Sequence, residues 1–267
     1  MTIINVLLLF AFFTYGLATV FRVLENVRGK PMTNHGFVAL LLGLGCHLAS
    51  LAMTIQETAS TQVFHIRTLF LTAPAVLVMV CAFIELRGKE TIFSVFILPL
   101  AMIFMVISGF VDSIMEGPYY HGPIFLTHVV ASVSGECFFL LSAISGMAYL
   151  FEVRRLKSKN RLRALSLFPP LARLDSLISG FADVGWLLFT FGLVFGAIWE
   201  QGILGTIFPR EIKQFTALGV WAIFAAIIGG RRFKGWAGTR IASMAIFGFI
   251  GSVILIFLTN TGFHEFP

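Results

Sequence analysis

The sequence predicts an all-α membrane protein, a polytopic bundle of about eight transmembrane helices. Hydrophobic residues fill 58% of the 267 positions and charged residues only 12%, whereas an average soluble domain carries about 25% charged residues. Eight crossings of roughly 20 apolar residues each would use about 160 positions and leave only short connections. We therefore expect one integral-membrane domain over residues 1–267, with no room for a separate soluble domain.

The crossings are marked by apolar runs that end at charged or turn-forming residues. Such runs are expected to be helical, because only internally hydrogen-bonded backbone is stable in hydrocarbon. The first run is too long for a cleaved signal peptide and lacks its basic leader, so we expect a true span. The expected helices are Ile3–Val23, His35–Ile55, Thr68–Glu85, Thr91–Val111, Ile124–Phe151, Leu177–Trp199, Gln214–Ile228 and Ile241–Phe263.

Basic residues concentrate in alternate connections between these helices. All but three of the 19 Lys and Arg residues lie at the ends of the first, third, fifth and seventh helices or in the connections that follow them, and the exceptions are Arg67, Arg210 and Lys213. Because cytoplasmic loops are enriched in Lys and Arg, the odd-numbered loops are expected to be cytoplasmic and both termini extracytoplasmic. We expect a multi-pass protein of the bacterial inner (plasma) membrane.

The net charge of +6 is explained by this topology and does not indicate a nucleic-acid partner. The basic run RRLKSKNRLR, Arg154–Arg163, is expected to set orientation and to touch anionic lipid of the bilayer. Docking of a protein partner is the alternative. The cysteines lie in apolar runs without CxxC or CxxCH spacing, which excludes a thiol redox motif and covalent haem attachment of the c type.

Two histidines are expected at the same membrane level. His128 lies about one turn into the fifth predicted helix from the extracytoplasmic side, and His264 follows the extracytoplasmic end of the last one. Two neutral imidazoles that face one another can hold a haem iron between them. The alternative is that each imidazole caps a helix end or meets interfacial water.

Two further ionisable residues are expected near the middle of the bilayer. His47 is about 12 residues, or roughly 18 Å, from the inner end of its helix, and Glu136 reaches a similar depth in the fifth helix. Ionisable side chains at this depth are rare and are functional candidates. They could pair, form part of a proton path or surround a second cofactor, and the alternative is a structural hydrogen bond between helices.

Several segments, in order, resemble the cytochrome c assembly protein family. This family includes the haem-handling synthase of the second cytochrome c maturation system and the HemX-like and YpjD-like membrane proteins. The resemblance is clearest over residues 124–266. Its segments are GLGCHLASL around His47, IFLTHVVASV at Ile124–Val133, the helix Leu171–Glu200, GWAGTR at Gly235–Arg240, similar to the family's GWRGRR, and GFHEF at Gly262–Phe266, similar to GLHSY.

The resemblance implies that His128 and His264 are the axial ligands of a haem b, with His47 at a possible second site. One segment departs from the family pattern. Where the family has the tryptophan-rich loop WGxxWxWDPKE, this chain reads QGILGTIFPRE. Pro209 and Glu211 are retained, but the tryptophans are replaced. Synthase activity is therefore not expected, and a single mid-membrane histidine leaves the second haem site incomplete.

We therefore expect a non-catalytic, haem-binding or haem-handling membrane protein with an accessory or regulatory role. Its expected partners are haem, the lipid bilayer and another membrane protein in haem delivery or cytochrome assembly. No activated nucleophile, phosphate-binding glycine loop or Cys/His metal motif indicates an enzyme. The alternatives are a scaffold or electron-transfer subunit of a larger membrane complex, with or without haem, and a transporter of haem or a metal ion.

Overall fold

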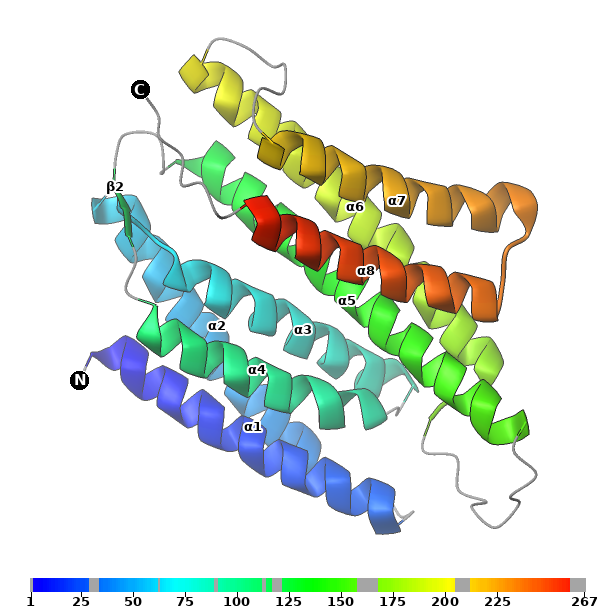
Figure 1. The fold of residues 1–267 in the computed structure, drawn as a ribbon. Coiled ribbons are helices and arrows are strands. Elements are labelled where there is room, and N and C mark those ends of the chain that lie inside the picture. The colour runs from blue at the N-terminus through cyan, green and yellow to red at the C-terminus, as the bar shows by residue number, and fades with distance from the viewer. Residues whose placement is uncertain are drawn as a thin grey trace. The chain divides into compact units, whose positions relative to one another are not determined.

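The computed structural model describes residues 2–28, 34–61, 63–88, 91–111, 114–116, 122–157, 168–204 and 212–259. These residues form eight α-helices and one short β-ribbon (Figure 1). The chain divides into two compact units, Met1–Leu126 and Thr127–Pro267, and each unit is described below by itself. The single domain expected over residues 1–267 stays a prediction.

The prediction of a polytopic helical membrane bundle is confirmed. Seven of the helices in the described part are long and apolar enough to cross a membrane, and the described part of the eighth contains a shorter apolar stretch, Thr239–Ile254. The helices are α1 (Ile3–Arg28), α2 (His35–Thr61), α3 (Arg67–Gly88), α4 (Ile92–Phe110), α5 (Pro123–Lys157), α6 (Leu171–Leu204), α7 (Ile212–Lys234) and α8 (Thr239–Thr259).

Several helices are longer than the apolar runs that predicted them. Helix α5 continues to Lys157, and α6 begins at Leu171 rather than at Leu177. Long basic side chains can reach water from a helix end, so a helix need not stop where the apolar run stops. The start of α6 follows two prolines, and the Pro170 carbonyl accepts hydrogen bonds from the N–H groups of Arg173 and Leu174.

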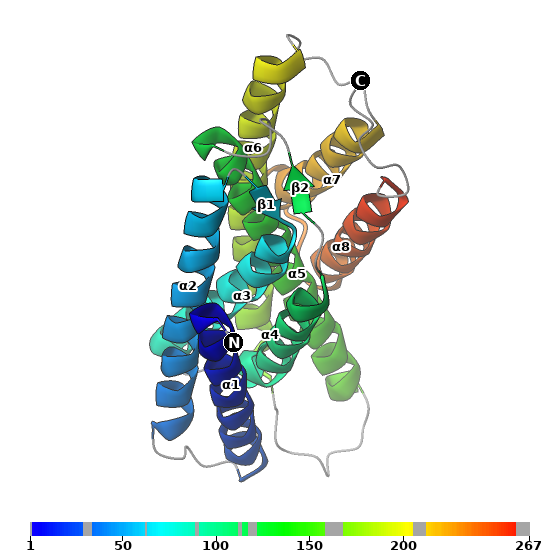
Figure 2. The same cartoon turned by 90° about the vertical axis from the view of Figure 1, so that its left-hand side faces the viewer.

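A short β-ribbon in the first unit was not predicted. Strand β1 (Val63–His65) pairs antiparallel with β2 (Ile114–Glu116), so that Phe64 lies opposite Met115. The ribbon joins the connection after α2 to the connection after α4 (Figure 2). Three residues are too few for the alternation of apolar and polar side chains that identifies a strand.

Helices α1 to α4 of the first unit form a closed four-helix arrangement. Helix α1 contacts α2 and α4, and α3 contacts the same two helices. Ala11, Tyr15 and Ala18 recur at helical spacing on α1 and are fully buried. The two alanines leave room for close helix approach on either side of the large tyrosine ring.

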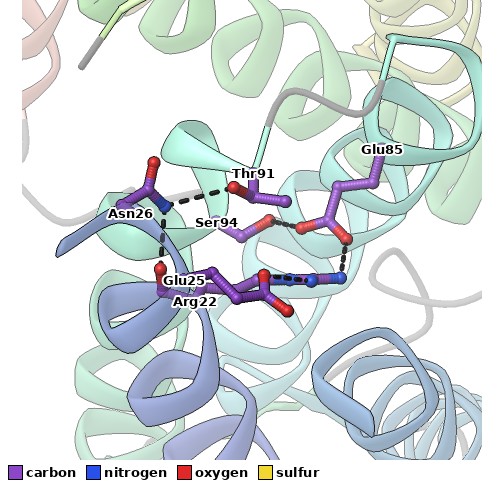
Figure 3. A network of polar contacts seen from close by, with 6 residues as sticks. All are labelled: Arg22, Glu25, Asn26, Glu85, Thr91 and Ser94. Carbon is purple, nitrogen blue, oxygen red and sulfur yellow. Dashed lines mark hydrogen bonds and ion pairs between the residues drawn. The ribbon is translucent and has the colours of Figure 1, made fainter. Parts of the chain in front are cut away.

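A buried ion-pair network connects three helices of this unit (Figure 3). The Arg22 guanidinium on α1 donates to Glu25 Oε2 at 2.6 Å and to Glu85 Oε2 on α3. The Ser94 hydroxyl on α4 donates to Glu85 Oε1 at 2.5 Å. Arg22, Glu25 and Glu85 are each at least nine-tenths buried, so the guanidinium is the cation that compensates two buried carboxylates.

We expect Arg22→Ala to destabilise the protein by about 3–5 kcal/mol, because removal of one partner leaves uncompensated buried charge. Thermal unfolding in detergent measures the change. Arg87→Ala, which removes an exposed arginine that stacks on Phe83, is the control and is expected to change stability by less than about 1 kcal/mol. Equal effects of the two substitutions would contradict a dominant role for the network.

The core of the second unit is built on stacked phenylalanines. The rings of Phe139 on α5 and Phe224 on α7 lie parallel, with centroids 3.5 Å apart and planes 7° apart. Phe189 on α6 packs against the same Phe139 ring, with centroids 5.7 Å apart. These aromatic contacts join three helices of the unit and hold α5 against α6.

The GWAGTR segment forms the turn between α7 and α8. Gly238 has a φ of +65°, a conformation that L side chains rarely adopt. Its N–H donates to Asp175 Oδ1 on α6 at 2.8 Å, and Arg231 at the end of α7 pairs with Asp175 Oδ2 at 2.6 Å. Asp175 thus ties the start of α6 to the α7–α8 turn, which places the basic residues at these ends together. The membrane orientation itself stays a prediction.

Candidate functional site

The structure gives His128 a defined hydrogen-bond partner within the second unit. His128 lies near the start of α5, and its Nδ1 is 2.8 Å from the carbonyl oxygen of Gly192 on α6. A carbonyl can only accept a hydrogen bond, so Nδ1 carries the hydrogen. The neutral ring then keeps its lone pair on Nε2, which is the atom available to a metal.

Two glycines on α6 make this contact possible. A Cβ atom at Gly196 would lie 2.7 Å from His128 Nδ1 and 2.8 Å from Cε1, and one at Gly192 would lie 2.4 Å from Ser132 Oγ. Glycines four residues apart lie on one face of a helix, where they allow close approach of a neighbouring helix. The sequence GLVFG, Gly192–Gly196, carries this signal.

Trp199 is a further residue of the site and was not predicted from the sequence. The rings of His128 and Trp199 are nearly parallel, with centroids 6.3 Å apart and planes 8° apart. Trp199 lies on α6 three residues after Gly196 and two residues before Gln201. The histidine is half-buried, packed beside an aromatic ring near the extracytoplasmic end predicted for these helices.

A hydrogen bond joins the end of α6 to the start of α7. The Gln214 side-chain amide near the start of α7 donates to Glu200 Oε1 near the end of α6. Glu200 directly follows Trp199, whose ring lies beside His128. The ends of the two helices that flank residues 205–211 are thus joined beside the histidine.

Three of the predicted site residues lie outside the described residues. They are His264, Pro209 and Glu211. The structure therefore locates one imidazole of the predicted pair, and the roles of these three residues stay predictions.

His47 is completely buried in the first unit and contacts Tyr15. The Tyr15 hydroxyl on α1 lies 3.2 Å from His47 Nδ1 on α2. His47 Nε2 is buried and makes no hydrogen bond of normal geometry with a described residue. The contact with Tyr15 is a hydrogen bond between helices, and Tyr15 was not singled out from the sequence.

Glu136 has a different partner, in the second unit. The Ser252 hydroxyl on α8 lies 3.0 Å from Glu136 Oε2. His47 and Glu136 belong to different units, and each makes its hydrogen bond, with Tyr15 and with Ser252 respectively, inside its own unit. Their proposed pairing stays a prediction.

The fold and this site define a multi-pass helical membrane protein that presents an oriented, neutral imidazole from α5. The chain belongs to the cytochrome c assembly protein family, because the family model described as "Cytochrome C assembly protein" matches residues 32–264. This match extends through both units.

Curated relatives agree with this assignment. They are named "Cytochrome c biogenesis protein CcsA". The relative from Parasynechococcus marenigrum (strain WH8102) is 29% identical over 142 residues, which are 52% of this chain and 47% of that protein. The relative from Guillardia theta is 26% identical over 140 residues, 47% of this chain and 46% of that protein. A third, from Prochlorococcus marinus (strain MIT 9303), is 34% identical over 97 residues, 35% of this chain and 30% of that protein. The matched region spans less than half the length of each relative.

We expect Gly196→Ala to destabilise the second unit, because the new Cβ would overlap the His128 ring. Overpacking of this kind costs about 1–3 kcal/mol, which exceeds the gain of roughly 0.5–1 kcal/mol from alanine in a helix. Thermal unfolding in detergent measures the difference. Gly180→Ala on the same helix, where a Cβ meets nothing within 4 Å, is the matched control. A Gly196→Ala protein as stable as this control would show that the histidine does not pack as described.

Proposed function

We propose that this chain is a non-catalytic, haem-binding or haem-handling membrane protein with an accessory or regulatory role in cytochrome c assembly. The observation that carries the proposal is the hydrogen bond between His128 Nδ1 and the Gly192 carbonyl. Family membership supports haem handling, and the proposed partner is another membrane protein in haem delivery or cytochrome assembly. The proposed location is the bacterial inner membrane, with the site on the extracytoplasmic side.

The donor chemistry of His128 fits an axial ligand of haem b. A ligating histidine usually donates its second ring N–H to a carbonyl or carboxylate, which fixes its tautomer and orientation. The Gly192 carbonyl provides that acceptor, and the Nε2 lone pair remains for iron. Haem, when bound, supplies an iron that accepts two axial ligands and changes its oxidation state. We assign the second axial position to His264.

Neighbouring side chains support the same imidazole. Ser132 lies on the same helix face, with its hydroxyl 3.5 Å from His128 Nδ1. Gly196 leaves room for the ring, and the Trp199 ring lies nearly parallel to it, with centroids 6.3 Å apart. These residues hold the ring in place before any ligand arrives, which lowers the entropic cost of binding.

The non-catalytic part of the proposal rests on the segment Gln201–Glu211. It retains Pro209 and Glu211 of the family's loop but not the tryptophans, so we do not expect it to present haem to an apocytochrome. For His47, complete burial and the contact with Tyr15 favour a structural hydrogen bond over a second haem site.

We expect the purified protein, supplied with haem, to show the absorption spectrum of a low-spin b-type haem. His128→Ala and His264→Ala are each expected to abolish it, because each removes one axial ligand. Visible absorption spectra of the oxidised and the reduced protein in detergent measure this. His35→Ala, at the exposed start of α2, is the control and is expected to leave the spectrum unchanged.

A wild-type protein that stays colourless with haem would contradict the proposal. Copurification distinguishes the alternative of a scaffold or electron-transfer subunit. A stoichiometric membrane partner retained without any haem would favour the scaffold, whereas a haem-loaded protein without that partner would argue against it.

A further inference from the structure

We propose that Glu136 is a proton-binding site inside the membrane, occupied at neutral pH as a carboxylic acid whose O–H donates to Ser252. The inference goes beyond haem handling and does not depend on it. It rests on the placement of Glu136 in α5, on the geometry of its contact with α8, and on the absence of a nearby cation among the described residues.

Glu136 lies in the middle of the apolar part of α5. It is the only Asp, Glu, Lys or Arg between Pro123 and Phe151. It lies 13 positions after Pro123 and 15 positions before Phe151, so it is about 20 Å along the helix axis from each at 1.5 Å per residue. An ionised carboxylate at this depth is costly unless it is paired.

Helices α5 and α8 lie side by side in this unit (Figure 1), and Ser252 connects them at Glu136. The Ser252 hydroxyl oxygen lies 2.8 Å from the Phe249 carbonyl oxygen, one turn earlier in α8, and 3.0 Å from Glu136 Oε2. A serine hydroxyl has one hydrogen and can donate it to only one of the two. When Ser252 donates to Phe249, the contact with Oε2 requires the hydrogen to be on Glu136.

The alternative distribution of hydrogens is unfavourable. If Ser252 donated to an ionised Glu136 instead, the carboxylate would have a single neutral donor, on Oε2. Its Oε1 is buried and makes no hydrogen bond with a described residue. A buried carboxylate without a cation and without donors on both oxygens takes up a proton instead of staying charged. In the neutral acid, the Glu136 O–H donates to the Ser252 hydroxyl, and that hydroxyl donates to the Phe249 carbonyl. Each of these groups then has a hydrogen-bond partner.

The helices around Glu136 offer no compensating cation at its level. On α5 the adjacent titratable group is the Cys137 thiol, which is buried, and His128 is two turns away. Helix α6 has no charged residue between Asp183 and Glu200. After its first turn, α7 has no charged residue before Arg231, and α8 has no charged residue after Arg240. Only a proton is available on these helices to neutralise Glu136.

Infrared spectroscopy of the protein tests the proposal directly. At neutral pH the wild type is expected to show a carboxylic-acid C=O stretch above the amide band, and it is expected to shift down in D₂O. Glu136→Gln keeps the shape of the side chain and is expected to remove that band. Ser252→Ala is expected to keep the band but shift it to higher frequency, because the acid loses its hydrogen-bond acceptor.

Glu152→Gln is the matched control, because Glu152 forms an ion pair with Arg155 on the same helix. Its substitution is expected to leave the band unchanged. A wild-type protein without a carboxylic-acid band, or a band of equal intensity in wild type and Glu136→Gln, would overturn the proposal. Neither result depends on haem, so this experiment and the haem spectrum test the two proposals independently.

Discussion

The candidate haem site depends on one hydrogen bond between two helices, from His128 Nδ1 to the Gly192 carbonyl. That bond decides which ring nitrogen carries a hydrogen, and so which nitrogen is left for iron. It forms because glycines at 192 and 196 remove the Cβ atoms that would collide with Ser132 and with the His128 ring. The same carbonyl is part of the backbone of α6, so its position is fixed by the helix rather than by a movable side chain.

In both units, polar side chains of the membrane-spanning helices form hydrogen bonds with a neighbouring helix. Hydrocarbon offers no water, so a polar side chain is stable there when another helix supplies its partner. The indole N–H of Trp221 on α7 donates to the Thr190 hydroxyl on α6 at 2.9 Å, and the Ser142 hydroxyl on α5 donates to the Ile178 carbonyl on α6 at 2.8 Å. Such contacts set the rotation of each helix about its own axis, and this rotation brings His128 to Gly192.

The sequence was sufficient to predict the helices but not their partners. Long apolar runs bounded by charge marked every crossing, and the prediction that the second helix starts at His35 is confirmed. Helices that are apolar on all sides have no amphipathic stripe to show which face meets which neighbour. The contacts of Gly192, Trp199 and Ser252 therefore could not be deduced. His128 was found through resemblance and depth, whereas the roles of His264, Pro209 and Glu211 stay predictions.

The most direct test of the account is chemical rescue of the proposed ligand. In His128→Gly the imidazole is removed while Gly192 and Gly196 keep their places, so added imidazole can occupy the vacated position. The account predicts that haem in this variant loses the low-spin spectrum and regains it when free imidazole is added. A His128→Gly protein that retains the wild-type haem spectrum without imidazole would contradict the account.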